Sequence, residues 1–266
     1  SLPGIAEMSP DQLPPHPDAE APRTRERIRP LLPPSWCLGL PTGSPADRQD
    51  GRVRIGTWNL AGRWDARHLR LLTGQECDVW LLTEVRADVS LPGFSSHVTA
   101  GRMAARRHWA GIFCRDPLEP MPDPHPASAA ASAFGLSLCS SILPWRSCGS
   151  TPWGDGTSGE KTSRALDQLM SSLPGTKLVW GGDWNHAMQG REWTGSVAGR
   201  TAIKAALSRL RLKLPTAESP HRIPGLLSID HIAVPASAQV YCTTRVIAED
   251  DAGNRLSDHD AYTTEV

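Results

Sequence analysis

Acidic, amide and histidine side chains follow apolar, strand-like segments at five places along the chain. They are Asn59 after RIGTW, Glu84 after WLLT, Asp183 and Asn185 in GGDWN, Asp230 in SID, and Asp258 with His259 in SDH. An α/β domain places its ligand site at the carboxyl ends of its strands. A single Asp or Asn there is more often a turn former or a helix cap. The ordered set of these residues, and not any one of them, therefore indicates a ligand site.

The chemistry that suits such a set is metal-assisted hydrolysis of a phosphoester. Hydrolysis needs negative charge neutralised on the non-bridging oxygens, a positioned water and a stabilised leaving oxygen. Mg²⁺ takes carboxylate oxygens as ligands and keeps several waters. We expect Glu84 and Asp258 to bind Mg²⁺, with Mn²⁺ as a substitute. Asn59 is expected to complete the cluster as a ligand or as a hydrogen-bond partner.

Strand-like and helix-like segments alternate from Arg52 onward, and these elements must position the side chains. Strands are expected at RVRIGTWNL, DVWLLTEV, WAGIFCR, FGLSLCSSIL, KLVWGGDWN, LSIDHIAVP, QVYCTTRVIA and DAYTTEV. DVWLLTEV is apolar nearly throughout, as buried central strands are. Helices are expected at ARHLRLLTGQ, KTSRALDQLMSSL and GRTAIKAALSRLRL, and loops at GFSSHVTAGRMAARRH, PMPDPHPASAAAS and RSCGSTPWGDGTSG. This alternation predicts an α/β or α+β sandwich.

The motifs W-N, L-x-E-V, G-D-x-N, S-I-D-H and S-D-H occur in this order between residues 52 and 266. In this order the set resembles the endonuclease/exonuclease/phosphatase superfamily, which comprises deoxyribonuclease I-like and exonuclease III-like metal-dependent phosphoesterases. The resemblance implies a four-layered sandwich of two packed, mostly antiparallel sheets flanked by helices. No phosphate-binding GxxxxGK[ST] or zinc-binding HExxH pattern occurs in the chain.

The resemblance also implies roles for the catalytic residues. Asp183 would orient or deprotonate the attacking water, and Asn185 would fix that water or the phosphate. Asp230 would hydrogen-bond His259, fix its tautomer and favour its protonated form. His259 would then act as a base or as an electrostatic clamp, and the sequence leaves both roles open.

One position departs from the family pattern. Deoxyribonuclease I-like members carry a second histidine, and others a tyrosine, at the end of the strand before the long helix. The matching segment here is FGLSLCSSILPW, which places Ser140 at about that position. A serine hydroxyl can hydrogen-bond a phosphate but is a poor general acid near neutral pH, so proton donation to the leaving group must come from elsewhere.

Basic residues in three segments are candidates for binding the substrate. The segment RMAARRHW holds Arg106, Arg107 and His108 just before an expected strand, and a solvated loop is nearly as good an interpretation. Arg200 follows the GDWN motif, and Arg222 precedes SIDH.

The charges of the chain balance, with 28 Lys and Arg against 28 Asp and Glu. This argues against attachment to nucleic acid or membrane by bulk charge, although not against a local basic groove. No apolar segment approaches the ~18 residues of a membrane span. No export signal is visible, so the cytoplasm is the expected compartment. No feature points to a protein partner.

Proline is concentrated in residues 1–50, which hold 11 of the 24 prolines and few apolar residues. Such a segment cannot form a core of its own. We expect it to be a draped or partly disordered extension, with one domain over residues 51–266. Within that domain the cysteines are expected to be buried free thiols. Trp58 and Trp184 are expected to pack in the core and not to stack on bases.

The substrate is less well defined than the reaction. The expected function is hydrolysis of phosphodiester bonds in DNA or RNA. A small-molecule phosphoesterase of the same superfamily is the alternative, because fold does not fix the substrate. A catalytically silent binding module is a third hypothesis, and the absent second histidine alone favours it.

Overall fold

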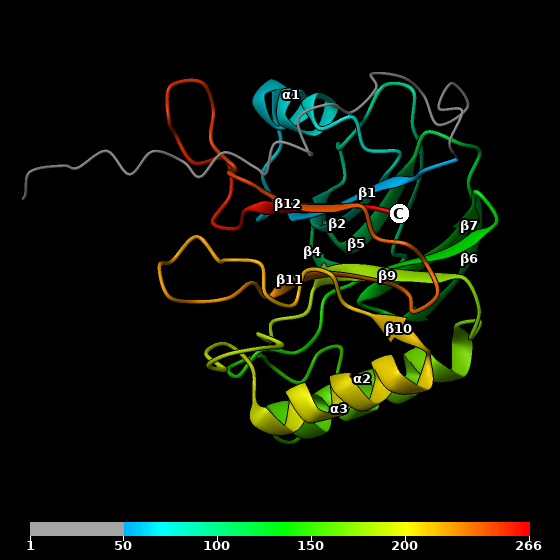
Figure 1. Cartoon of the computed structure of the whole chain (residues 1–266). Helices are drawn as coiled ribbons and strands as arrows, with labels where there is room; N and C mark the ends of the chain where they lie inside the picture. Colours follow the sequence, from blue (N-terminus) through cyan, green and yellow to red (C-terminus); the bar gives the residue numbers. More distant parts are fainter. Residues whose placement is uncertain (1–50) are drawn as a thin grey trace, which may run out of the picture.

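Two β-sheets packed against each other form the centre of the structure, which is a computed structural model and describes residues 51–266. The expected extension over residues 1–50 lies outside the described residues. One helix covers the outer face of the first sheet, and two helices cover the outer face of the second (Figure 1). The result is the four-layered sandwich of mostly antiparallel sheets that the sequence predicts.

The first sheet has seven strands. In spatial order they are β12 (Cys242–Val246), β13 (Ala261–Glu265), β1 (Arg54–Asn59), β2 (Val79–Arg86), β5 (Arg107–Cys114) and β3 (Ser95–Val98), with β4 (Arg102–Ala104) also paired to β5. β1 and β2 run parallel, and the other neighbours are antiparallel. Asn59 pairs with Thr83, so the carboxyl end of β1 lies beside Glu84.

The second sheet has six strands. In spatial order they are β10 (Leu212–Lys213), β11 (Asp230–Pro235), β9 (Leu178–Asp183), β8 (Leu136–Ser141), β7 (Ser128–Ala133) and β6 (Glu119–His125). Only β8 and β9 run parallel among these pairs. Asp230 at the start of β11 pairs directly with Asp183 at the end of β9.

A polar cap marks the start of each helix. Asp65 accepts two backbone N–H groups ahead of α1 (Ala66–Gly74), and Thr157 with Glu160 forms a reciprocal capping box at the start of α2 (Ser158–Ser172). Ser196 caps α3 (Val197–Arg209). The caps place the starts of α2 and α3 a few residues before the predicted segments, because apolar spacing marks only the buried part of a helix.

Alternate residues of β2 belong to different cores, which explains why this strand is apolar nearly throughout. Leu81 lies between the two sheets with Ile55 and Ile112. Trp80 and Leu82, on the other face, lie in the layer beneath α1. A single strand therefore contributes to both the layer between the sheets and the layer below the helix.

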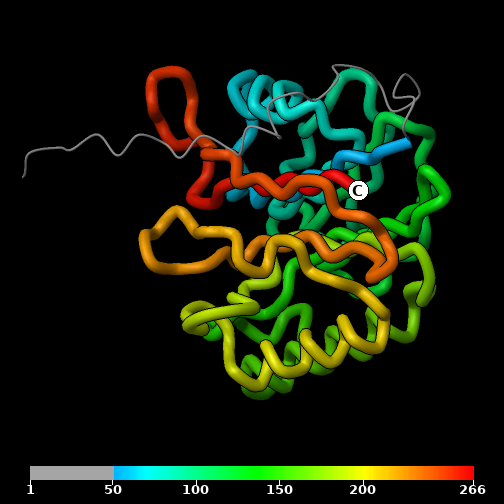
Figure 2. Tube along the Cα trace, in the orientation of Figure 1, coloured from blue at the N-terminus to red at the C-terminus, as the bar shows by residue number. Residues whose placement is uncertain are grey.

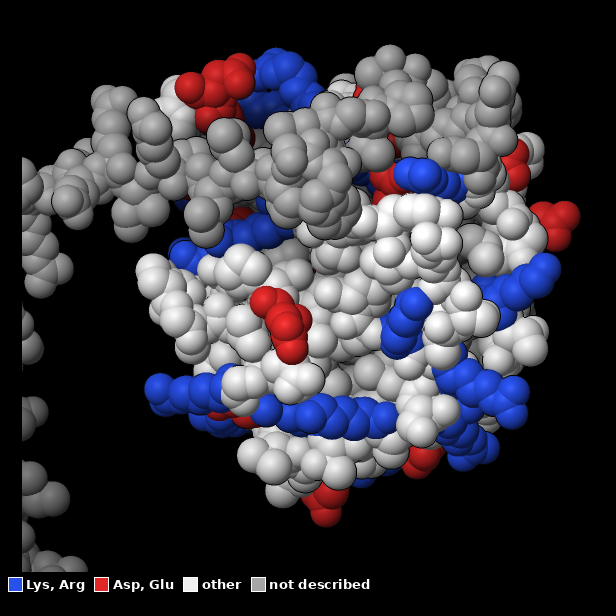
Figure 3. All heavy atoms as spheres, viewed as in Figure 1, with Lys and Arg blue, Asp and Glu red and all other residues white. Residues whose placement is uncertain are grey.

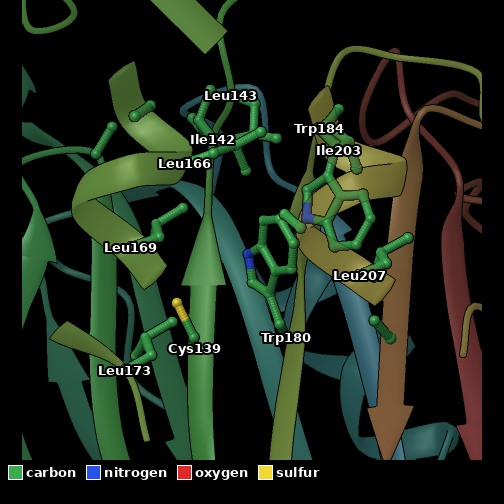
Figure 4. Packing of buried hydrophobic residues seen from close by; sticks show 14 of the residues in the cluster. Cys139, Ile142, Leu143, Leu166, Leu169, Leu173, Trp180, Trp184, Ile203 and Leu207 are labelled. Carbon is green, nitrogen blue, oxygen red and sulfur yellow. The ribbon is translucent and has the colours of Figure 1, made fainter. Parts of the chain in front are cut away.

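A third core fills the space between the second sheet and its two helices. The rings of Trp180 and Trp184 lie 4.1 Å apart between their centroids and pack among side chains that include Leu169 and Ile203 (Figure 4). Trp58 in the first sheet is likewise fully buried. The packing role expected for Trp58 and Trp184 is therefore confirmed.

Two of the segments predicted as loops contain strands. PMPDPHPASAAAS forms most of the hairpin of β6 and β7, and GFSSHVTAGRMAARRH contributes β3 and β4. β6 is the last strand of its sheet, where a proline that lacks an N–H is tolerated. The alanines of β7 are small enough to be buried between the sheets. The loop prediction for PMPDPHPASAAAS was therefore wrong, because its prolines are tolerated in an edge strand.

The predicted buried free thiols are found at four cysteines of the described residues. Cys77, Cys114, Cys139 and Cys148 are buried free thiols, and Cys37 lies outside the described residues. Burial raises the pKa of the Cys77 and Cys139 thiols to about 12. These thiols are therefore protonated and unreactive near neutral pH.

Candidate active site

The polar residues singled out in the sequence meet at one end of the two sheets. β1 contributes Asn59, β2 Glu84, β9 Asp183, β11 Asp230, and the loop before β13 Asp258 and His259. The loops that lead into β11 and β13 project from the same side of the molecule (Figure 2). Carboxyl ends of β1, β2 and β9 therefore lie beside amino ends of β11 and β13.

Asn59 joins the two sheets through its side-chain amide. Nδ2 donates hydrogen bonds to Oε1 of Glu84 at 3.2 Å and to Oδ2 of Asp183 at 2.9 Å. Oδ1 accepts the backbone N–H of Ala61 at 2.8 Å. The side chain is almost fully buried, so these bonds fix its orientation. Of the two roles expected for Asn59, this geometry favours hydrogen-bond partner over metal ligand.

The segment that carries Asp258 and His259 is tied to β1. The hydroxyl of Ser257 donates to the Asn59 carbonyl oxygen at 2.7 Å, and it accepts the backbone N–H of His259 at 3.1 Å. The indole of Trp58 donates to the His259 carbonyl oxygen at 3.2 Å. The buried strand β1 thus positions a loop located about 200 residues later in the sequence.

His259 lies between two buried carboxylates. Its Nδ1 is 2.7 Å from Oδ2 of Asp230, and its Nε2 is 4.0 Å from Oδ2 of Asp183. Burial alone would lower the pKa of His259, but the charges of Asp230 and Asp183 outweigh burial and raise this pKa to about 10. The imidazole is therefore positively charged near neutral pH, with Nδ1 donating its proton to Asp230.

The pKa of Asp183 is shifted toward neutral pH. Burial and the facing Asp230 raise the pKa of Asp183 to about 7, although His259 and the amide of Asn59 act in the opposite direction. A carboxyl group with a pKa near neutrality can both accept and release a proton at physiological pH.

Asn185 is part of the same turn as Asp183. Its backbone N–H donates to Oδ1 of Asp183 at 3.0 Å, and its Nδ2 donates to the Leu143 carbonyl oxygen at 3.0 Å. Its φ of 53° is in the left-handed region that Asn tolerates better than most residues. These constraints hold the Asn185 amide beside the carboxylate.

Glu84 and Asp258 are the expected metal ligands. Glu84 accepts from Asn59 through Oε1 and from the Arg107 guanidinium through Oε2 at 2.6 Å. Asp258 is exposed on the surface next to His259. The Glu84 carboxylate already holds a guanidinium and therefore lies where positive charge is favoured, and Asp258 belongs to the loop that Ser257 ties to β1. Carboxylates are the hard oxygen ligands that Mg²⁺ takes, so these two residue types suit that ion.

Another group of possible ligands is formed by Asp183, Asp230 and His259, whose ligand atoms lie within 4.8 Å of one another. A metal ion there would need an unprotonated imidazole nitrogen. The pKa of His259, about 10, keeps the ring protonated. With its own imidazolium present, this second group is already partly balanced in charge.

The basic residues proposed from the sequence occupy different surroundings. Arg106 is exposed and lines, together with Arg107, a hollow of about 340 Å³ next to Gly62. His108 contacts the Thr99 carbonyl oxygen through Nδ1 at 2.7 Å. Of these three side chains, Arg107 is the one that contacts Glu84.

The other two basic candidates lie between the site strands β9 and β11. Arg200, in the first turn of α3, binds Glu192 at 3.3 Å and the Gly190 carbonyl oxygen at 2.8 Å, so it ties the helix to the loop after β9. Arg222 is exposed. Neither side chain contacts the carboxylate cluster through a hydrogen bond or ion pair in the described structure.

Ser140 does not fit the expected substrate contact. Its side chain has no exposed surface, and its hydroxyl donates to the Leu82 carbonyl oxygen of the other sheet at 2.9 Å. The neighbouring Ser141 hydroxyl accepts from the Trp180 indole at 3.0 Å and is equally buried. Ser140 thus joins the two sheets, Ser141 bonds to a side chain of the neighbouring strand β9, and neither hydroxyl is exposed to a substrate.

His221 is a residue near the site whose place the sequence did not settle. Burial lowers the pKa of His221 to about 4, and the nearby charge of His259 adds to the effect. Its Nδ1 accepts the backbone N–H of Ile223, and its ring lies 4.7 Å from that of Trp193. The only signal was the position of HRIPG shortly before SIDH.

The surface of the described residues shows local clustering of charge despite the overall balance. On the face in Figure 3, Lys and Arg side chains gather in the lower part, where Figure 1 shows α2 and α3, and acidic side chains are few and separate. No helix between residues 51 and 266 is long and apolar enough to cross a membrane.

Comparisons with known proteins agree with the fold. No family model matches the sequence, and no curated protein matches it. Among solved structures, an AP endonuclease from Archaeoglobus fulgidus is 14% identical with a TM-score of 0.61, covering 80% of this chain and 98% of that one. The endonuclease domain of TRAS1, a telomere-specific non-LTR retrotransposon, is 13% identical with a TM-score of 0.59, covering 81% and 98%.

A third solved structure carries the superfamily name. The endonuclease/exonuclease/phosphatase from Bacteroides vulgatus is 15% identical with a TM-score of 0.55, covering 80% of this chain and 98% of that one. Likeness at such low identity concerns the fold. The chain has the deoxyribonuclease I-like fold of the endonuclease/exonuclease/phosphatase superfamily.

Proposed function

We propose that this chain is a divalent-metal-dependent phosphodiesterase of the endonuclease/exonuclease/phosphatase superfamily that hydrolyses DNA or RNA. One observation carries the proposal. A protonated His259 lies between Asp230 and Asp183, and Asp183 is connected through Asn59 to Glu84. A base, a positive charge and a candidate metal ligand are thus held in one network by residues of both sheets.

Asp183 accepts the proton of the attacking water. A pKa near 7 leaves a large fraction of the carboxylate ionised at neutral pH while keeping it basic enough to take a proton. The Asn59 amide and the Asn185 backbone N–H hold its two oxygens in place. The side-chain oxygen of Asn185 is the atom that can accept a hydrogen bond from the same water.

His259 acts as an electrostatic clamp in this mechanism and not as the base. Its pKa of about 10 means that the ring carries a proton throughout the neutral range and cannot accept another. Its Nδ1 proton is held by Asp230, so Nε2–H is the donor available to a phosphate oxygen. Preorganised positive charge at this position stabilises charge that develops on phosphate in the transition state.

Glu84 and Asp258 would hold the divalent ion, and Asn59 would orient Glu84. When bound, a Mg²⁺ ion supplies positive charge for the phosphate oxygens and for the leaving oxygen. The chain itself offers no histidine or tyrosine from the end of β8, where Ser140 and Ser141 are buried. Proton donation to the leaving group therefore falls to a water.

The surroundings of Glu84 favour a polymeric substrate over a small molecule. Arg107, which holds Glu84, lines a hollow together with Arg86 and Arg106, and Arg106 is exposed at the surface. Side chains that reach out from the reacting centre can contact phosphates on either side of a scissile bond. The AP endonucleases and the retrotransposon endonuclease domain among the structural neighbours also suggest nucleic acid.

The test is a substrate panel with the purified full chain and either Mg²⁺ or Mn²⁺. The panel holds single-stranded and double-stranded DNA, duplex DNA with an abasic site, RNA, a generic phosphodiester and a phosphomonoester. We expect metal-dependent cleavage of at least one nucleic acid, and its loss in Glu84→Gln. Cleavage confined to the small esters would replace the polymer by the small-molecule alternative. The absence of turnover on every substrate would favour the silent binding module.

A further inference from the structure

Arg107 is bound to one of the two candidate metal ligands. Its Nη1 donates to Oε2 of Glu84 at 2.6 Å, and the two side chains are 35% and 20% exposed. The other carboxylate oxygen of Glu84 accepts from Asn59. Both oxygens that a divalent ion would use are therefore occupied by donors of the chain itself.

The contact between Arg107 and Glu84 is built into the fold. Gly62, at a φ of +64°, lies against the guanidinium, and a Cβ at this position would be 2.4 Å from the Arg107 Nε. The backbone N–H of Gly62 also donates to the Glu84 carbonyl oxygen at 3.1 Å. A residue without a side chain is thus used where the guanidinium passes closest to the backbone.

The neighbouring arginines differ from Arg107 in this respect. Arg86 pairs with Arg107 across β2 and β5, but its guanidinium binds Asp88 at 2.5 Å. Arg106 is exposed at the turn between β4 and β5. Arg107 is the arginine of this hairpin whose guanidinium contacts a candidate metal ligand.

A guanidinium and a divalent cation cannot share a carboxylate without repelling each other. Arg107 also lines the hollow of about 340 Å³, together with Gly62, Arg86, Ala104, Ala105 and Arg106. In this hollow a displaced guanidinium would lie near Arg106, which forms no ion pair within the described part of the chain, and a phosphate group would neutralise both charges. Arg86, in contrast, is already paired with Asp88. Arg107 thus has two alternative anionic partners, namely Glu84 and a phosphate of the substrate.

We propose that Arg107 and the catalytic metal ion compete for Glu84, so that metal binding releases Arg107 to a substrate phosphate in the adjacent hollow. The proposal rests on the metal site of the proposed function. It requires a reciprocal effect, because coupling between two binding equilibria is symmetric. A phosphate-like anion that draws Arg107 away from Glu84 strengthens metal binding by the same factor that metal strengthens anion binding.

The experiment measures Mg²⁺ affinity by calorimetry on the metal-free full chain. Arg107→Gln should bind Mg²⁺ about tenfold more tightly than the wild type, within the usual range of coupling between sites. Arg106→Gln removes the same charge one residue away and should change the affinity by less than about twofold. Arg107→Lys keeps the charge and should remain close to the wild type. Arg107→Met, which removes the charge but keeps an unbranched side chain, should tighten Mg²⁺ binding in the same way and preserves the test if the Gln variant does not fold.

The second arm adds sodium sulfate, a tetrahedral oxyanion, against sodium chloride of equal ionic strength. Sulfate should tighten Mg²⁺ binding to the wild type several-fold and leave Arg107→Gln unaffected. Unchanged or weaker Mg²⁺ binding in Arg107→Gln would overturn the competition, and an equal sulfate effect in both proteins would overturn the phosphate exchange. Glu84→Gln separates this result from the metal site, because Mg²⁺ binding that survives that change would contradict the ligand assignment itself.

Discussion

Replacing Asp230 with Asn tests whether His259 carries a positive charge for the reason given by the structure. Asp230 is 1% exposed, and its Oδ2 lies 2.7 Å from Nδ1 of His259. Asn has nearly the same shape but no charge. Burial, which lowers the pKa of His259, is then opposed mainly by Asp183, whose nearest oxygen is 4.0 Å from Nε2. The pKa of His259 should fall from about 10 to the ordinary range.

The size of the effect on turnover depends on pH. If the pKa falls from about 10 to about 6.5, the protonated fraction of His259 at pH 8 falls from about 99% to about 3%. The ratio of wild-type to variant kcat/KM should therefore rise from near unity at about pH 5.5 to roughly 30-fold at about pH 8. This ratio rises with pH because the raised pKa keeps His259 charged at high pH in the wild type, whereas the variant loses the charge.

Two measurements check this prediction. Nuclear magnetic resonance of the His259 ring in the metal-free protein gives its pKa directly, and kcat/KM against pH gives the consequence for catalysis. In a His259→Gln background the second change, Asp230→Asn, should no longer produce a defect that grows toward high pH, and should only shift the titration of Asp183 to lower pH because Asp230 no longer raises that pKa. A wild-type ring that titrates below about pH 8, or a defect in Asp230→Asn that is the same at every pH, would refute the charged His259.

Three further predictions concern the base, the metal and stability. Asp183→Asn should leave folding and substrate binding close to the wild type and lower kcat by roughly 10²- to 10⁴-fold, as loss of a general base does; near-normal kcat would assign the water to another residue. Chelation of divalent ions should abolish turnover, Mg²⁺ or Mn²⁺ should restore it, and Zn²⁺ should be a poor substitute because the site lacks soft ligands; full activity in excess chelator would contradict metal dependence. Burial lowers the pKa of His125 and His231 to about 4, so both are neutral in the fold and their stabilisation is lost as pH falls below the unfolded value. Each should cost about 2 kcal/mol of unfolding free energy between about pH 7.5 and about pH 5, measured by urea denaturation as the difference between the wild type and His125→Gln or His231→Gln so that the opposite contributions of Asp183 and His259 cancel, and a difference that does not change over this interval would contradict the neutral state.

The strands of the central sheets could be predicted from the sequence because their cores impose a clear pattern. β2 is apolar on both faces, since Leu81 lies between the sheets and Trp80 and Leu82 lie beneath α1. β6 and β7 could not be predicted in this way. β6 is rich in proline and lies at a sheet edge, and β7 consists of Ser and Ala, whose small size is useful only once the opposing sheet is present.

The sequence could predict which residues form the candidate site, but it could not predict most of the contacts that they make. Polar residues at strand ends indicated which side chains meet, as the hydrogen bonds between Asn59, Glu84 and Asp183 illustrate. Pairing of Arg107 with Glu84 depends on the register between β2 and β5, which no local pattern specifies. The burial of Ser140 depends on the contact with Leu82 of the other sheet, and packing of two sheets is a property of the whole fold.

Charge balance explains how this arrangement can bind both a divalent ion and a phosphate. With both carboxyls ionised, Asp183 and Asp230 are partly compensated by the imidazolium of His259, which leaves one negative charge. Glu84 is compensated by Arg107, and Asp258 adds one further negative charge at the surface. The carboxylate cluster therefore carries two uncompensated negative charges while Arg107 is in place, and three once Arg107 is released. A divalent ion then leaves one negative charge on the cluster, and the released guanidinium of Arg107 supplies positive charge that attracts the phosphate.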